Sequence, residues 1–274
     1  MRFRFAHPLG VACSLLTLGL LGHALDINTT ANATTLLNTN ALPGEAVKPG
    51  TELRILCAGD SITSGWLSDD DGGNGNGYRL PLRDDLSKDE VVFAGTVSAG
   101  NMTDGYFAAW PGKTVKYISD HVGPSLKQRP NIILLHAGTN DMDDRPLRST
   151  EGNEPVAVAE RLGDLIDQMI EACPDAVILV AIIIDSCDPH ISPRIPEYQA
   201  AIPGIVEKRR LAGHHVLAVD FTTFSESDLQ DCVHPTVDGY RKFGDYWIRW
   251  EPIRHMKIQP GPRFSGRACF SSKS

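Results

Sequence analysis

Runs of apolar residues alternate along the chain with segments of helical spacing. The apolar runs predict five strands, at residues 53–58, 91–94, 132–136, 177–184 and 215–219. Apolar residues three or four positions apart predict helices at residues 80–86, 115–122, 156–172, 195–211 and 237–250. The run at 177–184 is apolar at every position, so both of its faces must be covered. This pattern predicts an α/β fold, a three-layer α/β/α sandwich around a five-stranded parallel sheet.

Polar residues with chemical potential follow three of these strands. Ser61 comes shortly after the first run, Asn140 after the third, and Asp231 and His234 on the segment after the fifth. In a flavodoxin-like parallel sheet the carboxyl ends of the strands lie at one edge, and ligands bind there. We therefore expect these side chains to converge although they lie far apart in the sequence.

Ser61, His234 and Asp231 are the residue types of a serine nucleophile site. A serine hydroxyl needs an imidazole to take its proton and a carboxylate to orient that ring. Asp231 and His234 are three residues apart, so the carboxylate can reach Nδ1 while Nε2 stays free for Ser61. Thr63 stands where the Gly-x-Ser-x-Gly elbow requires its second glycine, which argues against an α/β-hydrolase fold.

Each segment has a structural interpretation when it is taken alone. Gly59-Asp60-Ser61 is an ordinary turn sequence, since all three residue types favour turns. Asn140 is suited to cap a helix, and Asp231 to cap the last one. The conjunction of these segments in one chain, each beside an apolar run or in a loop, favours a catalytic site.

The chain contains four segments that hold, in order, Ser61, Gly112, Asn140 and His234. Their order and sequence contexts are those of the four blocks of the SGNH (GDSL) hydrolase superfamily. The chain resembles this superfamily over about residues 53–250. Within it, the chain resembles the carbohydrate esterase family 3 branch, the acetylxylan-esterase-like proteins. That likeness rests on Gly59-Asp60-Ser61-Ile62-Thr63, Gly77-Tyr78-Arg79, Pro111-Gly112, Gly138-Thr139-Asn140-Asp141, His234-Pro235 and Gly239-Tyr240.

The resemblance implies a role for each matching residue. Ser61 matches the nucleophile, His234 the base and Asp231 the partner of the base. The backbone N–H groups of Ser61 and Gly112 and the side-chain amide of Asn140 match the donors to the oxyanion. The implied fold is the flavodoxin-like SGNH hydrolase fold.

The resemblance also implies an activity. We expect a secreted serine esterase, a carboxylic-ester hydrolase, that removes acetyl groups from plant cell-wall polysaccharide, xylan in particular, through an acyl-enzyme. The branch often has His where Trp110 stands, which bears on substrate contacts more than on catalysis. Two alternatives stay open: a lipase or lysophospholipase of the same superfamily, and a non-catalytic carbohydrate-binding or cell-wall protein on the same fold. Beyond an acetylated polysaccharide or oligosaccharide, no obligate protein partner is evident.

The ends of the chain differ in composition from its centre. Residues 1–24 are typical of a signal peptide, with Arg2 and Arg4 before a short apolar stretch and small residues at its end. Residues 25–50 are rich in Thr and Asn and predict a flexible leader; residues 51–250 form the hydrolase domain, and residues 251–274 a basic tail. Acceptor triplets for N-glycosylation begin at Asn28, Asn32 and Asn101. We expect an extracellular protein with no membrane attachment after cleavage.

The net charge of −8, with no basic stripe, argues against binding to nucleic acid. A glycine-rich segment at residues 72–77 does not directly follow a strand, and Asp69-Asp70-Asp71 before it would repel phosphate. No cofactor and no metal ligand set is predicted. A structural Ca²⁺ held by the three aspartates stays open, although their spacing fits no known calcium loop.

Once Cys13 has left with the signal peptide, five cysteines remain, so at least one is unpaired. Cys57 lies within the first apolar run and is predicted to be a buried thiol. Cys187 follows the fourth strand and Cys232 lies after the fifth, which predicts a disulfide between them at the edge of the site. The alternatives are that Cys232 merely packs, or that Cys187 pairs with Cys269 in the tail. His136 is predicted to be a hydrogen-bonded core histidine.

Overall fold

An eight-stranded sheet runs through the part of the chain that the computed structural model describes, residues 35–36 and 50–248. Its strands are β1 (Thr35–Leu36), β2 (Glu52–Gly59), β3 (Glu90–Ala94), β4 (Val97–Ser98), β5 (Tyr106–Ala109), β6 (Ile132–His136), β7 (Val177–Ile182) and β8 (Val216–Asp220). Their order is β1-β8-β7-β6-β2-β5-β4, and β3 also pairs with β2. The strands β8, β7, β6, β2 and β3 are the five predicted ones, and every pair among them is parallel. The flavodoxin-like order is confirmed.

Three short strands were not predicted. β5 pairs with the carboxyl end of β2 at Ala58 and Gly59, beyond the part of β2 that pairs with β3. β4 pairs antiparallel with β5. β1 pairs with β8. The two residues of β1 lie within the segment predicted to be a flexible leader, so the prediction differs from the structure there. Two residues carry no periodic pattern, and their pairing depends on the free backbone groups of an edge strand.

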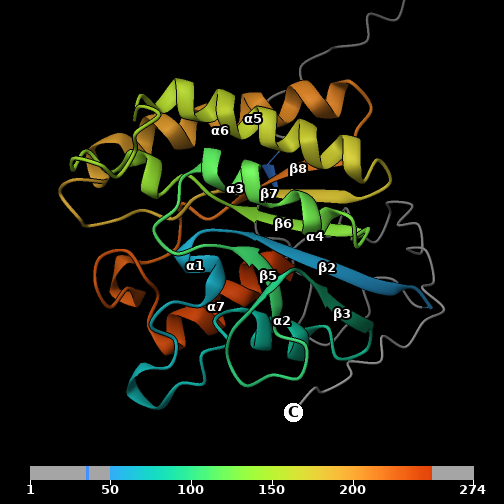
Figure 1. The fold of residues 1–274 in the computed structure, drawn as a ribbon. Coiled ribbons are helices and arrows are strands. Elements are labelled where there is room, and N and C mark those ends of the chain that lie inside the picture. The colour runs from blue at the N-terminus through green and yellow to red at the C-terminus, as the bar shows by residue number, and fades with distance from the viewer. Residues whose placement is uncertain (1–34, 37–49, 249–274) are drawn as a thin grey trace, which may run out of the picture. The chain divides into compact units, whose positions relative to one another are not determined.

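The helices cover both faces of the sheet. Figure 1 shows α3 (Val115–His121), α4 (Gly123–Leu126), α5 (Pro155–Ala172) and α6 (Ile195–Leu211) on one face, and α1 (Ser61–Ser64), α2 (Arg79–Asp85) and α7 (Val237–Ile248) on the other. Within the described residues, four 3-10 helices lie between the longer elements: η1 (Asp70–Gly72), η2 (Asn140–Met142), η3 (Ser192–Arg194) and η4 (Glu226–Asp228). All five predicted helices are present, and the predicted end of the last one, residues 249–250, lies outside the described residues.

Alternate side chains of each central strand enter opposite cores. In β2, Leu56 and Ala58 pack under α3 to α6, whereas Ile55 and Cys57 pack against α2 and α7. This confirms the three layers and the prediction for Cys57, which is a buried free thiol. Burial raises the pKa of Cys57 to about 12, so this thiol is inert. None of the helices in the described residues is long and apolar enough to cross a membrane.

Candidate active site

Ser61 begins α1 directly after β2. Asp60 caps this helix, because its Oδ1 accepts a hydrogen bond from the N–H of Ile62 at 3.1 Å. A side chain at Gly59 would collide with the carbonyl oxygen of His136 and the hydroxyl of Thr63, so only glycine fits there. The turn therefore presents the Ser61 hydroxyl at the carboxyl edge of the sheet, at the start of a helix whose first N–H groups have no partner within the helix.

Ser61, His234 and Asp231 form a continuous hydrogen-bonded chain. Nε2 of His234 lies 2.8 Å from Oγ of Ser61, and Nδ1 of His234 lies 2.7 Å from Oδ2 of Asp231. Ser61 is buried, and the side chain of His234 is 14% exposed. The predicted convergence of these three residues is confirmed. This arrangement lets the imidazole take the hydroxyl proton while the carboxylate stabilises the charge that forms.

A bend over residues 231–234 lets the side chain of Asp231 reach the ring of His234, three residues later. Oδ1 of Asp231 accepts the backbone N–H groups of Val233 at 3.1 Å and His234 at 2.7 Å, while Oδ2 faces the ring. Partial burial pushes the pKa of Asp231 upward, but the hydrogen bonds and charge of His234 outweigh it, and the pKa lies below its usual value. Asp231 is thus ionised at neutral pH, as an orienting carboxylate requires.

A disulfide joins Cys187 to Cys232, with Cα atoms 4.7 Å apart. Cys232 lies between Asp231 and His234 and has a positive φ of 68°. Its carbonyl oxygen accepts hydrogen bonds from Cys187 N at 3.2 Å and Ser186 Oγ at 2.7 Å. The predicted bond is confirmed, and both alternatives, in which Cys232 merely packs or Cys187 pairs with Cys269, are wrong. The loop that holds Asp231 and His234 is therefore tethered to the segment after β7.

Gly112 and Asn140 line the same cleft as Ser61 and His234, a cavity of about 470 Å³. Gly112 adopts a left-handed φ of 73°. Nδ2 of Asn140 donates to the carbonyl oxygen of Lys113 at 3.1 Å, which links the Asn140 loop to the Gly112 segment. Asn140 is the first residue of η2 rather than its N-cap, so the capping interpretation is wrong. The cleft thus combines a candidate nucleophile, a candidate base and two candidate donors to an oxyanion.

Four further charged side chains line the cleft: Asp143, Arg145, Arg148 and Asp188. Nη2 of Arg145 lies 2.8 Å from Asp143 and 2.9 Å from Asp188. Arg148 is more exposed than Arg145. Sequence reasoning missed this group, because its members come from two loops that approach only in the folded chain.

The model of the GDSL-like lipase/acylhydrolase family matches residues 57–242. The chain belongs to this family. The predicted resemblance is confirmed, and with it, at the level of the family, the predicted class of carboxylic-ester hydrolases.

A multidomain esterase from Ruminococcus flavefaciens is 27% identical over 247 residues, which are 77% of this chain and 30% of that protein. The chain thus spans about a third of the length of that relative. A family 3 carbohydrate esterase from Clostridium thermocellum has a TM-score of 0.61 at 26% identity, covering 74% of this chain and 98% of that one. A family 3 carbohydrate esterase from Talaromyces cellulolyticus has a TM-score of 0.59 at 19% identity, covering 71% and 94%, and supports the fold alone.

Two segments that carry the resemblance to the family hold α1, the helix that begins at Ser61, in place. The buried guanidinium of Arg79 donates to the carbonyl oxygens of Thr63 at 2.9 Å and Ser64 at 3.1 Å, at the carboxyl end of α1. On α7, the hydroxyl of Tyr240 donates to the carbonyl oxygen of Trp66 at 2.8 Å. Both residues hold the backbone that follows Ser61, a positioning role that the sequence alone did not reveal.

Two buried carboxyl groups lie next to site residues of this GDSL-like hydrolase. Asp60 precedes Ser61, and Asp141 follows Asn140 and accepts the N–H of Val115 at 2.9 Å. Burial raises the pKa of Asp60 and that of Asp141 to about 7, and the charge of Asp141 contributes to the shift at Asp60. Both acids therefore lose their protons near neutral pH.

His136 belongs to the core and does not line the cleft. Its ring packs edge-to-face on Phe221 and Phe243. Neither ring nitrogen has a hydrogen-bond partner within the described part of the chain, so the prediction of a core position is confirmed and that of a hydrogen-bonded ring is wrong. Burial lowers the pKa of His136 to about 3, which keeps the ring neutral.

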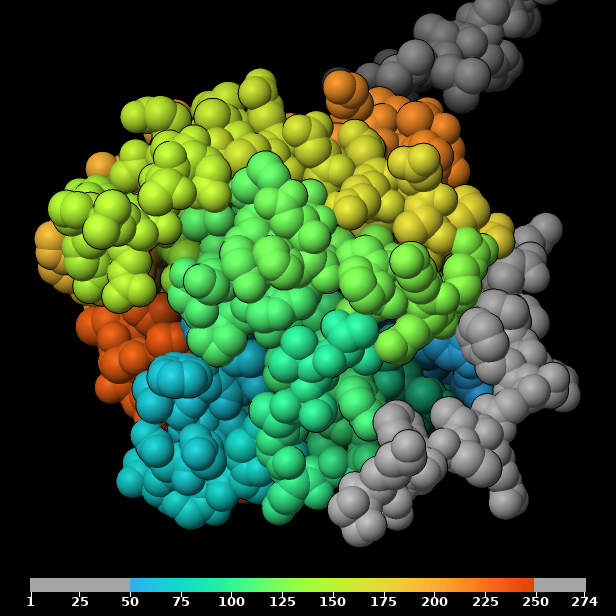
Figure 2. All heavy atoms as spheres, viewed as in Figure 1, coloured from blue at the N-terminus to red at the C-terminus, as the bar shows by residue number. Residues whose placement is uncertain are grey.

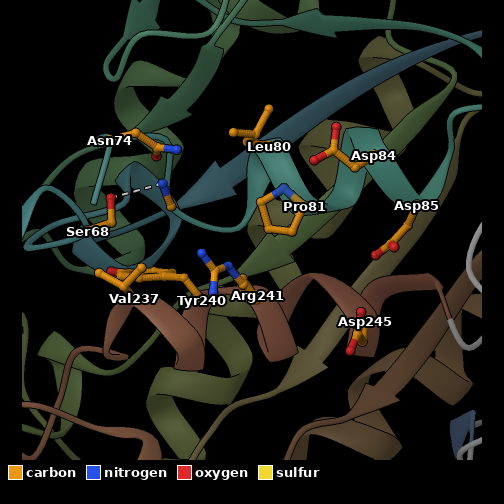
Figure 3. A pocket seen from close by; sticks show the side chains of 11 residues that line it. Ser68, Asn74, Leu80, Pro81, Asp84, Asp85, Val237, Tyr240, Arg241 and Asp245 are labelled. Carbon is orange, nitrogen blue, oxygen red and sulfur yellow. Dashed lines mark hydrogen bonds between the residues drawn. The ribbon is translucent and has the colours of Figure 1, made fainter. Parts of the chain in front are cut away.

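A separate cavity lies between α2 and α7 (Figure 3). Asp85 of α2 and Asp245 of α7 both line it; burial and, next, the charge of Asp245 raise the pKa of Asp85 to about 6. Neither Ser61 nor His234 lines this cavity, which is therefore no part of the candidate site. Among residues 35–36 and 50–248, no three His, Cys, Asp or Glu side chains are arranged to hold a metal ion.

Proposed function

We propose that the chain is a secreted serine esterase that hydrolyses acetyl esters on plant cell-wall polysaccharide, acetylxylan in particular, through an acyl-enzyme. The observation that carries this proposal is the hydrogen-bonded chain from Ser61 through His234 to Asp231, in a cleft that Gly112 and Asn140 also line. A non-catalytic protein on this fold would have no need to keep all of these groups together in one cleft.

The proposed reaction has two halves. His234 takes the proton of Ser61 as its Oγ attacks the ester carbonyl, and the oxyanion is held by the N–H groups of Ser61 and Gly112 and by the amide of Asn140. His234 then gives the proton to the departing sugar oxygen, leaving acetyl on Ser61. His234 next takes a proton from water as the water attacks this ester, and it returns the proton to Oγ of Ser61 as the bond to the acetyl group breaks and acetate leaves. Every reacting group comes from the chain, so we propose that no cofactor takes part, and chelators should leave the activity unchanged.

Two observations support acetyl esters of sugars over lipids. The relative at 26% identity is described as a family 3 carbohydrate esterase. The cleft is lined by Asp143, Arg145, Arg148 and Asp188, whose polar groups suit sugar hydroxyls and disfavour a hydrocarbon chain.

Export of the protein is part of the proposal. A disulfide at Cys187–Cys232 fits an oxidising compartment, because such bonds are rare in the cytosol. Asn101, in one of the predicted glycosylation triplets, is exposed. Residues 1–24, with the predicted signal peptide, and the triplets at Asn28 and Asn32 lie outside the described residues. Amino-terminal sequencing of the protein from the culture medium should give a start near residue 25.

The experiment that tests the activity is a comparison of acyl groups. The purified protein is given acetylated xylo-oligosaccharides, p-nitrophenyl acetate and p-nitrophenyl octanoate. Release of acetate from the oligosaccharides at a kcat/KM well above that for octanoate is the expected result. A preference for octanoate would support the lipase alternative, and no turnover of any ester would support a non-catalytic protein.

A further inference from the structure

A second cavity, of about 520 Å³, adjoins the catalytic cleft. Trp66 and Pro111 line both cavities, so they form a shared wall. The second cavity is bounded by apolar side chains, among them Val97, Phe107 and Trp110. In Figure 2 the surface of the segment after Ser61, coloured blue to cyan, lies beside that of the segment around residues 95–112, coloured green. These two segments form its opposite walls.

Trp66 is a large apolar side chain that the free protein leaves 50% exposed. It is not a loose surface residue. Its N–H donates to the carbonyl oxygen of Ser61 at 3.0 Å, and its carbonyl oxygen accepts the hydroxyl of Tyr240 at 2.8 Å. The indole is therefore carried on a backbone fixed both to the nucleophile and to α7, which is how a preformed contact surface is held.

The opposite wall is fixed too. Oδ1 of Asn76 accepts the backbone N–H groups of Asn101 at 2.9 Å and Met102 at 3.0 Å, and its Nδ2 donates to the side chain of Asn101 at 2.7 Å. Gly75 and Gly100, which line the cavity, pack so closely that a Cβ at Gly75 would lie 3.1 Å from the Cα of Gly100. The cavity thus exists before any ligand enters.

We propose that this second cavity binds a neutral sugar ring of the polysaccharide chain, next to the ring whose ester lies at Ser61, with Trp66 as the stacking surface. The inference rests on the proposed function and adds where the chain runs. The C–H face of a pyranose is apolar and covers an indole, while its hydroxyl groups donate to carboxylates such as Asp69 and Asp70, which line the same cavity. Those two charges disfavour a fatty acyl chain and an acidic sugar.

Trp110 also lines this cavity. Its ring packs edge-to-face on Tyr117, 5.9 Å between centroids, so it too is held in place. A second aromatic side chain is therefore fixed in the wall of the proposed sugar site.

The test measures binding apart from chemistry. In the Ser61→Ala background, the affinity for unacetylated xylohexaose is measured by titration calorimetry, with and without Trp66→Ala. Covering about 60 Å² of apolar surface corresponds to about a tenfold change in affinity, so Trp66→Ala should weaken binding by about tenfold or more. Trp66→Tyr, which keeps an aromatic face, should recover most of the affinity. Leu211→Ala removes another exposed apolar residue, 72% exposed at the end of α6, and should leave the affinity unchanged.

A kinetic arm separates the two kinds of substrate. Ser98 lines the second cavity but not the catalytic cleft, and Ser98→Trp should fill the second cavity. In the otherwise unchanged protein, Ser98→Trp should lower kcat/KM for acetylated xylohexaose about tenfold relative to p-nitrophenyl acetate. If it lowered hydrolysis of p-nitrophenyl octanoate and spared the oligosaccharide, the cavity would be an acyl site and the inference would be wrong.

The outcomes distinguish the inference from the proposed function. An unaltered protein that does not deacetylate xylo-oligosaccharides overturns the proposed function. The sugar site alone is overturned by a different set of results. The unaltered protein deacetylates the oligosaccharides, Trp66→Ala keeps full affinity for xylohexaose, and Ser98→Trp keeps the full kcat/KM for acetylated xylohexaose relative to p-nitrophenyl acetate.

Discussion

Removal of the Cys187–Cys232 disulfide should cost both stability and activity. The bond closes a segment with a sequence separation of 45 residues. The chain-entropy relation gives about 4 kcal/mol for a loop of this length at 25 °C, which is the most that the bond contributes if the folded state is unchanged. We therefore expect the double variant Cys187→Ala/Cys232→Ala to lose about 2 to 4 kcal/mol of unfolding free energy.

The effect on activity follows from where the bond lies. Cys232 sits between Asp231 and His234, so freedom at this position displaces the ring from the Ser61 hydroxyl. The hydrogen bonds that Cys187 and Ser186 give to the carbonyl oxygen of Cys232 stay and limit the movement. A displacement of about 1 Å can cost about 10²-fold, so we expect kcat to fall by about 10- to 100-fold in a variant that remains folded.

The assay is urea unfolding followed by circular dichroism, with kcat for p-nitrophenyl acetate measured well below the unfolding midpoint. The double variant keeps the buried thiols of Cys57 and Cys173, and dithiothreitol should not change its activity, whereas it should lower that of the unaltered protein. Unfolding free energies that agree within about 0.5 kcal/mol, together with equal kcat, would refute the reasoning.

Three further predictions concern the site. Ser61→Ala should lower kcat/KM for p-nitrophenyl acetate by about 10³-fold or more with an unchanged circular dichroism spectrum, and near-normal turnover would exclude Ser61 as the nucleophile. Asn140→Ala should lower kcat by about 10²- to 10³-fold with little change in KM, because an oxyanion donor acts in the transition state; an unchanged kcat would leave Asn140 a loop residue. Asp60 keeps its proton in the fold up to a pKa of about 7 but loses it near pH 4 when unfolded, so the stability it contributes is present below about pH 4 and is lost as the pH rises to about 7. Between pH 4.5 and 7.5 the unfolding free energy of Asp60→Asn should therefore fall less than that of the unaltered protein, by on the order of 1 to 4 kcal/mol. An identical fall in both proteins would contradict the raised pKa of Asp60.

The sequence predicts the buried strands and long helices because their burial leaves a periodic pattern. The β7 run is apolar throughout, and the predicted bounds of α6 match the structure, Ile195–Leu211. β5, Tyr106–Ala109, gave no such signal, because it is four residues long and half alanine. It exists because β2 extends past β3 and leaves its carboxyl end free to pair.

Some residues of the candidate site could likewise be predicted from the sequence, and others could not. The convergence of Ser61, Asn140, Asp231 and His234 could be predicted, because each follows a strand at the same edge of a parallel sheet. The roles of Arg79 and Trp66 could not. Arg79 acts on the carbonyl oxygens of Thr63, Ser64 and Ala99, which meet only in the folded chain. A single exposed tryptophan has no pattern in the sequence, and its significance comes from the cavity beside it.

The most direct test of the account is to find which residue a serine-directed fluorophosphonate modifies. The reagent forms a covalent bond only with an activated hydroxyl, so it reports on the Ser61–His234–Asp231 arrangement without any choice of substrate. Peptide mass spectrometry of the labelled protein should locate one adduct, on Ser61, with loss of esterase activity in proportion to labelling and no adduct in His234→Ala. An active protein that is not labelled, or a label on another serine, would contradict the claim that Ser61 is the nucleophile.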